Sequence, residues 1–540
     1  MLLKQVWVRR WLLDNDRAQR LYHVAVVLLL SLGVFFRSRR YWVDPIGLWA
    51  DEASWARRLF KHSLTGFDFR PIGYMDATQV AVHVYSNEQT IRILSYVAGL
   101  TSLIIAIDIG RLAFRSRVVR LLYLAVVVFH PLLIDMAREF KPYSLEFCVH
   151  LGLIWLFLRW QASGARRWLH ALLACTGVSF LFAYNVVFLF PAIFGLLGVK
   201  FLREKSYRSL FITVFAACAA LALIAVIYFG VLSQMGTTAE GEKFWGGKYD
   251  VFYLANDAAR GGAVQSHASW LVHKYLDLAV YPDVQRDKWA FPASVSSTVA
   301  GALIEANYYL WLALHALGLV ALFFAGRRHL LALLVVPLVV IMGFNWFGIW
   351  PFGPFRANTF LMSYYILIPM VGLDAVSSWL GKFGWAAAAV ACSLILVPDL
   401  SVGFDSHARK HFSTGPSEMR ALLRRLKELR EHGPELARTE KSYVLMDWYS
   451  CSPFEYYTQY NDSTRREFGN YLADNFDFEC TKTPKGVQSF MHKLSGKSFF
   501  VVVTDDRALR ATRAVVRKGA AILDEERVRE THDLYYATAN

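Results

Sequence analysis

Long apolar stretches alternate with short polar connectors over roughly the first four hundred residues. Two pairs of stretches are separated by only a few residues, which leaves the boundaries between them open. About eleven stretches approach the ~20 residues that a helix needs to cross a bilayer. We expect spans at 21–36, 94–110, 118–134, 144–160, 168–184, 186–202, 210–232, 306–325, 329–348, 360–379 and 385–400. The pattern therefore predicts a mainly α-helical, polytopic transmembrane bundle over 21–400.

Residues 401–540 follow a different pattern. Apolar positions recur at helical spacing in Glu418–His432, and short apolar runs at Tyr443–Met446 and Phe499–Val503 are typical of buried strands. A further helix is expected at Arg507–Lys518. These elements predict a small α/β domain outside the membrane.

Two long connectors interrupt the bundle, at 37–93 and 233–305. The first contains apolar residues at i, i+3, i+4 and i+7, the spacing of one helix face: Ala77, Val80, Ala81 and Val84. Such a helix either lies in the membrane interface or packs as a small helix outside the membrane, and the sequence favours neither. The second connector is rich in glycine and polar residues and is able to order over a site.

Composition agrees with a membrane protein. Apolar residues make up 55% of the chain and charged residues 19%, against about 45–50% and about 25% in soluble domains. Disorder, a collagen-like repeat and a disulfide-dense secreted scaffold are thereby excluded.

The net charge of +15 would point to a polyanion such as nucleic acid in a soluble protein. Here the N-terminal segment 1–20 and every second short connector hold 19 Lys and Arg but only three acidic residues, and the rest of the chain sums to −1. Cytoplasmic connectors carry such an excess in membrane proteins. We therefore expect no nucleic-acid partner, a cytoplasmic N-terminus, and extracytoplasmic connectors at 37–93 and 233–305 together with an extracytoplasmic domain at 401–540.

The first stretch follows a basic segment and runs into Arg37, Arg39 and Arg40 without a small-x-small cleavage site. It is interpreted as a signal anchor rather than a removed signal peptide. We expect a multi-pass protein of a bacterial inner (plasma) membrane. Two of the six cysteines, Cys451 and Cys480, lie in the C-terminal domain. An oxidising compartment would allow a disulfide between them, although the sequence does not show whether they lie close enough.

Three charged clusters are candidates for chemistry, all on the expected extracytoplasmic side. The pair Asp51-Glu52 has apolar and aromatic neighbours that would partly desolvate a general base, but an acidic pair is also typical of a solvated loop or a helix start. A short turn after the third stretch combines Asp135, Arg138, Glu139, Lys141 and Tyr143. Interfacial anchoring accounts for Lys141 and Tyr143, and less well for such tightly packed mixed charges.

The third cluster is a single arginine, Arg356, in an aromatic loop shaped by proline and glycine between Trp350 and Phe360. A cation–π anchor would explain it, and so would a guanidinium fork for a lipid phosphate. No Gly-rich nucleotide motif accompanies the three clusters. Cations to stabilise a leaving phosphate and one carboxylate base suit sugar transfer from a lipid-linked phosphosugar to a hydroxyl.

Four motifs carry a resemblance to a known family. They are Asp51-Glu52, Arg92-Ile-Leu-Ser95, Ala137-Arg138-Glu139-Phe140-Lys141-Pro142-Tyr143-Ser144 and Pro351-Phe-Gly-Pro-Phe-Arg356. In this order and sidedness they resemble the GT-C glycosyltransferases. The branch is that of the protein O-mannosyltransferases and the lipid A aminoarabinose or galacturonic-acid transferases. The resemblance covers about residues 20–400.

The resemblance implies an inverting transfer of one sugar from a polyprenyl-phosphate donor to a lipid, glycan or protein hydroxyl. Asp51 would be the catalytic base, Glu52 its neighbour in the acceptor site, and Tyr143 a pocket residue. The donor phosphate would contact Arg138, Lys141 and Arg356. Glu88 and Arg92 fall in the part of the first connector that holds the phosphate in related enzymes, and Asp135 is a further pocket candidate.

A divalent metal is the main cofactor question. Asp51, Asp135 and Glu139 offer hard oxygen ligands of the kind that magnesium or manganese prefers, but their spacing is not diagnostic, and we expect no required metal.

Three rival functions stay open. A transporter or flippase of lipid-linked sugars would need charged residues near the bilayer midplane. An oligosaccharyltransferase would use a pyrophosphate-linked glycan and a metal. In the third, the C-terminal domain is a binding module and the bundle its anchor.

Overall fold

The structure is a computed structural model. It describes residues 16–43, 48–60, 70–230, 267–277, 297–347, 349–353, 356–384, 386, 388, 390–391, 413–414, 416–432, 442–468, 470–481, 489–490, 492–493, 498–503, 520–528 and 532–539. At many of these positions, including Asp51, Arg356, 520–528 and 532–539, only the backbone is described. Two compact units divide the chain. The bundle unit comprises Met1–Ser38, Asp68–Tyr74 and Leu94–Ser406, and the sheet unit comprises Arg39–Phe67, Met75–Ile93 and His407–Asn540.

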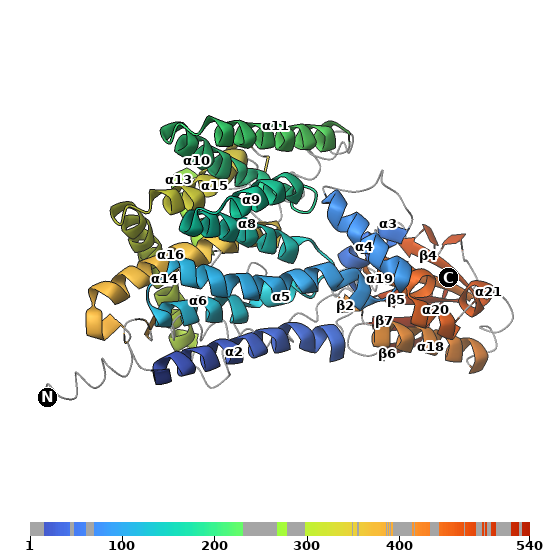
Figure 1. Ribbon diagram of the computed structural model, residues 1–540. Helices are drawn as coiled ribbons and strands as arrows, with labels where there is room; N and C mark the ends of the chain where they lie inside the picture. Colours follow the sequence, from blue (N-terminus) through green and yellow to red (C-terminus); the bar gives the residue numbers. More distant parts are fainter. Residues whose placement is uncertain are drawn as a thin grey trace. The chain divides into compact units, whose positions relative to one another are not determined.

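The bundle unit is built of helices (Figure 1). They are α2 (Asp16–Ser38), α5 (Glu88–Ala113), α6 (Arg117–Phe129), α7 (Pro131–Met136), α8 (Tyr143–Ser163), α9 (Arg166–Ser179), η3 (Tyr184–Phe188), α10 (Phe190–Arg203), α11 (Tyr207–Gly230), α13 (His267–Asp277), α14 (Ser297–Phe324), α15 (Arg328–Trp346), η7 (Arg356–Leu361), α16 (Met362–Trp379) and η8 (Gly381–Phe383). Helix α2 packs along α6, α8 along α9, and α14 along α16. The first residues of α5, up to Ile93, belong to the sheet unit.

Among the described residues, seven segments are long and apolar enough to cross a membrane. They are Gln19–Ser38, Glu88–Ala113, Tyr184–Arg203, Tyr207–Gly230, Glu305–Phe324, Arg328–Trp346 and Ala357–Trp379. Large apolar side chains of α11, including Phe211 and Phe229, are about 70% exposed, as expected of a helix whose outer face contacts lipid. The predicted membrane-spanning helical bundle is therefore confirmed, whereas the count of about eleven spans is not.

Some predicted spans are interrupted. The stretch 118–134 divides into α6 and α7 at His130, whose ψ of 118° is extended. Pro131 explains the break, because a proline disfavours the helical conformation of the residue before it. Helix α9 ends at Ser179, and the turn and 3₁₀ segment that follow separate it from α10. Most of the expected span at 385–400 lies outside the described residues.

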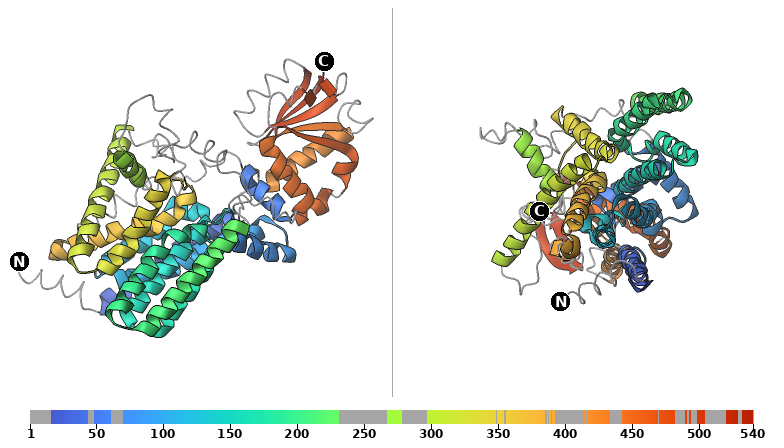
Figure 2. Two further views of the ribbon diagram at one scale, coloured as in Figure 1. Left: turned by 90° about the horizontal axis from the view of Figure 1, so that it is seen from above. Right: turned by 60° about the vertical axis from the view of Figure 1, so that its left-hand side comes forward.

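The sheet unit contains most of the α/β elements (Figure 2). They are η1 (Arg39–Val43), β1 (Leu48–Trp49), α3 (Ala50–Phe60), α4 (Ile72–Val84, of which the first turn belongs to the bundle unit), β2 (Ser413–Thr414), α18 (Pro416–His432), β3 (Ser442–Asp447), α19 (Trp448–Glu455), η11 (Tyr456–Tyr460), α20 (Asp462–Phe468), α21 (Tyr471–Asn475), β4 (Phe476–Thr481), β5 (Ser498–Val503), β6 (Ala520–Val528) and β7 (His532–Ala539). Five strands form one sheet in the order β4-β3-β5-β7-β6. Strand β3 is parallel to both β4 and β5, and β7 is antiparallel to β5 and β6.

Helix α18 and strands β3 and β5 agree with the predicted elements, and the predicted helix at Arg507–Lys518 lies outside the described residues. Val444 of β3 and Phe499 of β5 are fully buried. Both strands lie in the interior of the sheet, where burial on both faces is typical of parallel strands. The first connector also contributes to this unit. Strand β1 pairs antiparallel with β2, and helix α3 packs against α19. Residues near Asp51 and the C-terminal region therefore share one compact unit.

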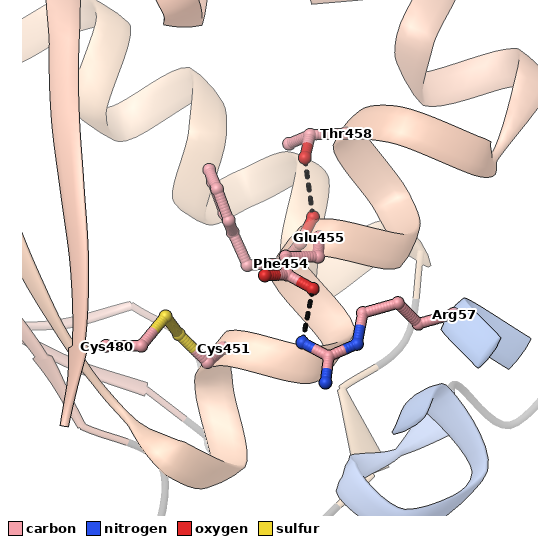
Figure 3. Close-up of a disulfide and its surroundings, with 6 residues drawn as sticks. All are labelled: Arg57, Cys451, Phe454, Glu455, Thr458 and Cys480. Carbon is pink, nitrogen blue, oxygen red and sulfur yellow. Dashed lines mark hydrogen bonds and ion pairs between the residues drawn. A yellow bond between two sulfur atoms is a disulfide. The ribbon is translucent and has the colours of Figure 1, made fainter. Parts of the chain in front are cut away.

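A disulfide joins Cys451 of α19 to Cys480 of β4, with the two Cα atoms 6.0 Å apart (Figure 3). It fixes the first turn of α19 to the sheet. At the far end of α19, Glu455 forms an ion pair of 2.6 Å with Arg57 of α3. Helix α19 is thus attached covalently to the sheet and by an ion pair to the helix that carries Asp51 and Glu52.

Helix α4 contains the predicted apolar face of the first connector. Val80 and Val84 on that face are 70% and 86% exposed, whereas Thr78 and Val82 on the other side are buried. The helix is therefore confirmed. The location of α4, either in the membrane interface or packed outside the membrane, stays a prediction.

Candidate functional site

Glu52 and Arg92 form a buried ion pair in the sheet unit. Glu52 lies in the first turn of α3 and Arg92 in the second turn of α5, and each is at most 3% exposed. The guanidinium donates from Nε to Oε1 at 3.1 Å and from Nη2 to Oε2 at 2.7 Å. Such a two-point contact is the strongest and most directional form of an arginine–carboxylate pair. Arg92 engages both oxygens of Glu52, which suits Glu52 to positioning rather than to accepting a substrate proton.

Asp51 precedes Glu52 as the second residue of α3. Its side chain lies outside the described residues. Helix α3 is amphipathic, and its apolar residues Ala53, Ala56 and Leu59 are buried. The backbone of Asp51 is therefore fixed on one side by this packing and on the other by the Glu52–Arg92 pair.

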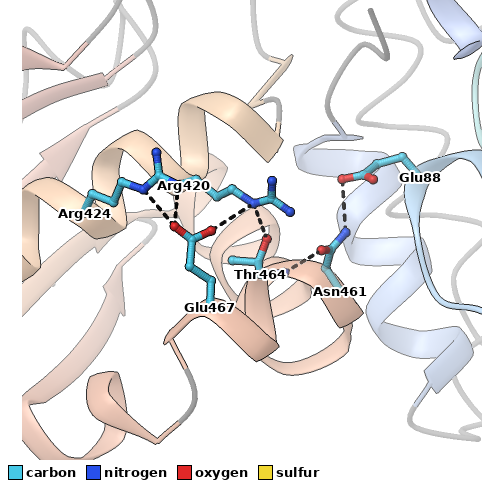
Figure 4. Close-up of polar contacts among 6 residues, drawn as sticks. All are labelled: Glu88, Arg420, Arg424, Asn461, Thr464 and Glu467. Carbon is cyan, nitrogen blue, oxygen red and sulfur yellow. Dashed lines mark hydrogen bonds and ion pairs between the residues drawn. The ribbon is translucent and has the colours of Figure 1, made fainter. Parts of the chain in front are cut away.

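Glu88 lies four residues before Arg92 on the same helix and is 4% exposed. Its Oε1 accepts a hydrogen bond of 3.3 Å from Nδ2 of Asn461 (Figure 4). The start of the helix is capped by Asn87, whose Oδ1 accepts from the backbone N–H of Thr90 at 2.7 Å. An Asn side chain in this position satisfies a helix N-terminus that has no partner within the helix. The structure therefore brings Glu52, Glu88 and Arg92 together in one unit.

The second charged cluster lies in the bundle unit, between α6 and α8. Asp135 in the short helix α7 forms an ion pair with Nη2 of Arg138, three residues later. Arg138 is 5% exposed, and its Nε has no hydrogen-bond partner among the described residues. Lys141 is 1% exposed, and Tyr143 is the first residue of α8. Burial of two cations, Arg138 and Lys141, near one carboxylate is costly in a membrane protein and typical of a functional site.

Helix α5 holds this turn in place. Ser95 donates from Oγ to the backbone oxygen of Lys141 at 2.6 Å, and Tyr74 lies 3.1 Å from the same hydroxyl. A Cβ added to Gly99 would lie only 2.5 Å from Cβ of Ala137, so the glycine permits the turn to approach the helix closely. The first residue of the Arg92-Ile-Leu-Ser95 motif thus pairs with Glu52, and the last residue bonds to the turn that contains Lys141.

Arg37 is a residue that the charge pattern did not single out as functional. It lies in the last turn of α2, is 1% exposed, and donates to the backbone oxygens of Val127 and Val128 at the end of α6. Its charge also repels that of Arg138. The sequence gives no signal for this role, because Arg37 directly follows the apolar stretch 21–36 and resembles a flanking charge. Arg37 adds a second guanidinium to the cluster around Arg138.

Arg356 is the first residue of η7 in the bundle unit, and its side chain lies outside the described residues. The loop before it is organised by Asn358, which is fully buried. Its Nδ2 donates to the backbone oxygens of Pro351 and Gly353 at 3.0 Å each, and its Oδ1 accepts from Nε1 of Trp350 at 3.0 Å. Gly353 has a φ of 111°, a conformation that favours glycine. The hydrogen bonds of Asn358 therefore attach residues 350–353 to η7, the helix that begins with Arg356.

No group of three or more His, Cys, Asp or Glu side chains within the described part of the chain is arranged to hold a metal ion. The side chain of Asp51 lies outside the described residues, and Asp135 is engaged by Arg138. Metal dependence therefore stays a prediction.

Comparisons with known proteins add the following. Residues 75–229, less than a third of the chain, match the family model described as dolichyl-phosphate-mannose-protein mannosyltransferase. The match includes Glu88, Arg92 and the turn from Asp135 to Tyr143, and excludes Asp51 and Arg356. A search of curated protein sequences finds no match.

Solved structures with a similar chain path include ArnT from Cupriavidus metallidurans, bound to undecaprenyl phosphate and in the apo state. Both are 12% identical, with TM-scores of 0.49 and coverage of 96% of this chain and 97% and 98% of ArnT. The Archaeoglobus fulgidus oligosaccharyltransferase, in complex with Zn and sulfate, is 14% identical, with a TM-score of 0.46 and coverage of 89% of this chain and 68% of that protein. The family match covers two of the four motifs, Arg92–Ser95 and Ala137–Ser144. Over residues 75–229 the chain is similar to the dolichyl-phosphate-mannose-protein mannosyltransferases, the branch of the GT-C glycosyltransferases that its motifs resemble.

Proposed function

We propose that this protein is an integral membrane glycosyltransferase of the GT-C type. It transfers a single sugar from a polyprenyl-phosphate donor to a hydroxyl acceptor on the extracytoplasmic face of the membrane, with inversion at the anomeric carbon. The observation that carries this proposal is the buried turn around Arg138. Its guanidinium has an Nε without a hydrogen-bond partner in the part of the chain that the structure describes, and it lies near further buried cations. A phosphate oxygen is the natural acceptor for such a donor.

Arg138, Lys141 and Arg356 bind the donor phosphate in this proposal. As the bond between the anomeric carbon and the phosphate oxygen breaks, negative charge grows on the departing polyprenyl phosphate. Fixed cations in a water-poor site stabilise this charge. The leaving group is already an anion, so it needs no protonation. Tyr143 and Asp135 line the donor pocket.

Asp51 acts as the general base. It takes the proton of the acceptor hydroxyl while the oxygen attacks the anomeric carbon from the face opposite the phosphate, which inverts the configuration. Glu52 does not compete for that proton, because Arg92 engages both of its oxygens. The pair holds the start of α3 and thereby orients Asp51. Precise placement matters because an error of about 1 Å in a reacting group can cost 10²-fold in rate.

The cation set makes a metal unnecessary in this scheme, so we propose that transfer needs no divalent ion. The charge distribution supports a cytoplasmic N-terminus and an extracytoplasmic sheet unit in a bacterial inner membrane. Transfer that persists undiminished in a chelator would agree with the first proposal, and loss of transfer that added magnesium or manganese restores would contradict it.

A transfer assay with the purified full-length protein tests the function. The donors are polyprenyl phosphates that carry a hexose, a pentose or a uronic acid, and the acceptors are lipid, glycan and peptide hydroxyls. We expect transfer from at least one donor and a loss of at least 10³-fold in Asp51→Asn, which keeps the side-chain size. Equal transfer by wild type and Asp51→Asn would show that Asp51 is not the base.

A further inference from the structure

Asn461 is a buried amide whose two ends have different partners. It is 1% exposed, and its Oδ1 accepts from the backbone N–H of Thr464 at 3.1 Å, which caps the first turn of α20. This contact orients the amide so that Nδ2 points to Oε1 of Glu88 (Figure 4). The C-terminal region therefore supplies a hydrogen-bond donor to a carboxylate from the first connector, 373 residues away in the sequence.

Tyr457 is a second polar side chain near the same carboxylate. It is fully buried, and its hydroxyl oxygen accepts from the backbone N–H of Leu48 at 3.2 Å. Burial raises the pKa of Tyr457 well above its ordinary value, and the nearby charge of Glu88 raises it further. The phenol therefore keeps its proton. Leu48 lies three residues before Asp51, so this hydroxyl connects η11 to the strand that leads into α3.

Two backbone contacts fix the same junction. Asp462 donates from its backbone N–H to the oxygen of Ser86 at 3.2 Å, and its Oδ2 accepts from the N–H of Ser86 at 3.1 Å. These bonds connect the start of α20 to Ser86, two residues before α5. The position of Asn461 relative to Glu88 is thus determined by several independent hydrogen bonds.

The hydrogen bond from Asn461 bears on which carboxylate Arg92 binds. Glu88 and Arg92 lie four residues apart on α5, a spacing at which opposite charges readily pair. Arg92 instead makes its two-point contact with Glu52. Glu88 accepts a hydrogen bond from Asn461, and the buried Tyr457 lies near it. Without these two neighbours, the Glu88 carboxylate would compete with Glu52 for Arg92, and the contact that holds α3 would weaken.

We propose that Asn461 and Tyr457 are positioning residues of the transferase, through which the C-terminal region keeps Arg92 on Glu52 and Asp51 in place. This inference rests on the proposed function. It makes the region around η11 and α20 part of the catalytic apparatus rather than a cap or a separate binding module.

Kinetics of the full-length protein with matched variants test the inference. Asn461→Asp keeps an oxygen for the Thr464 cap but removes the donor to Glu88. Its control is Asn475→Asp. In the described part of the chain, Nδ2 of Asn475 donates to the backbone oxygen of Tyr471 within α21. We expect Asn461→Asp to lower kcat at least tenfold with the donor KM changed less than twofold, and Asn475→Asp to keep wild-type kcat. Wild-type kcat in Asn461→Asp, or an equal loss in the control, would overturn the inference.

A hydroxyl deletion gives a second comparison within one element. Tyr457→Phe should lower kcat severalfold, whereas Tyr460→Phe, which removes a hydroxyl from a ring stacked on Phe60, should not. Thermal unfolding separates this inference from the proposed function, because it needs no substrate. Adding Glu88→Gln to Asn461→Asp should raise the unfolding temperature, since the introduced amide donates to the introduced carboxylate. Additive effects would overturn the contact, and absence of transfer by the wild type with every donor would overturn the proposed function instead.

Discussion

The two units each contain a buried arginine–carboxylate pair, and the pairs differ in how much of the guanidinium is used. In the sheet unit, Arg92 engages both oxygens of Glu52 through two nitrogens. In the bundle unit, Arg138 reaches Asp135 through one nitrogen, keeps an Nε without a partner among the described residues, and is repelled by Arg37. A guanidinium engaged in this way holds structure, whereas one with a spare donor and a like charge beside it is suited to bind an anion.

This difference in hydrogen bonding distinguishes a structural from an anion-binding arginine. The residue types of the two clusters do not distinguish them. Both clusters contain acidic and basic residues, and both are buried. In the proposed function, the sheet unit orients the base and the bundle unit binds the donor phosphate. Mutations of the two arginines should therefore differ in kind as well as in size.

The largest effect is expected for Arg92→Gln. It leaves Glu52 buried without its partner, which typically costs about 3–5 kcal/mol, so the midpoint of chemical unfolding of the sheet unit should fall markedly. Glu52→Gln in the same chain should restore part of this loss, because no uncompensated charge then remains. A change below about 1 kcal/mol would show that the pair is not what holds α3.

Loss of the disulfide should have the next largest effect. Cys451 and Cys480 close a loop with a sequence separation of 29, and a bridge of this kind typically contributes about 2–4 kcal/mol. The variant Cys451→Ser/Cys480→Ser should unfold at lower denaturant concentration, and reductant should lower the stability of wild type but not of the variant. Equal stability with and without reductant in wild type would contradict a structural role.

Arg138→Gln should act mainly on the donor. A hydrogen bond to a charged group is worth about 1.5–3 kcal/mol, so the donor KM should rise about 10- to 100-fold. The acceptor KM should change little, and steady-state kinetics with each substrate varied in turn separate the two constants. An unchanged donor KM would remove Arg138 from the phosphate site.

Arg57→Gln is expected to have the smallest effect and calibrates the others. Its ion pair with Glu455 is short, at 2.6 Å, but the two side chains are 31% and 25% exposed. Exposed pairs contribute less than about 1 kcal/mol. An unfolding midpoint as low as that of Arg92→Gln would show that burial does not distinguish the pairs.

Much of the fold follows from local pattern. Helix α18 and strands β3 and β5 are predictable because each carries its own apolar periodicity, and α14 to α16 because each is a long apolar run. Breaks within apolar sequence are harder to predict. The stretch 118–134 is apolar apart from Arg120 and His130, yet Pro131 divides it. Glu146 and His150, inside a predicted span, are buried in α8, where His150 contacts Tyr364 and Asn185.

The candidate site is predictable only where a motif is local. The turn from Asp135 to Tyr143 is visible as one short charged segment. The partner of Glu52 lies 40 residues away and that of Glu88 lies 373 residues away, and no periodicity connects such positions. Arg37 looks like a flanking charge until the structure shows its buried contacts.

Equilibrium binding of a polyprenyl phosphate, such as undecaprenyl phosphate, to the purified protein tests the division of tasks most directly. We predict that Arg138→Gln weakens binding at least tenfold and that Arg92→Gln, in the fraction that remains folded, binds as wild type does. Equal losses in both variants, or tight binding by Arg138→Gln, would contradict the assignment of the donor phosphate to the bundle unit.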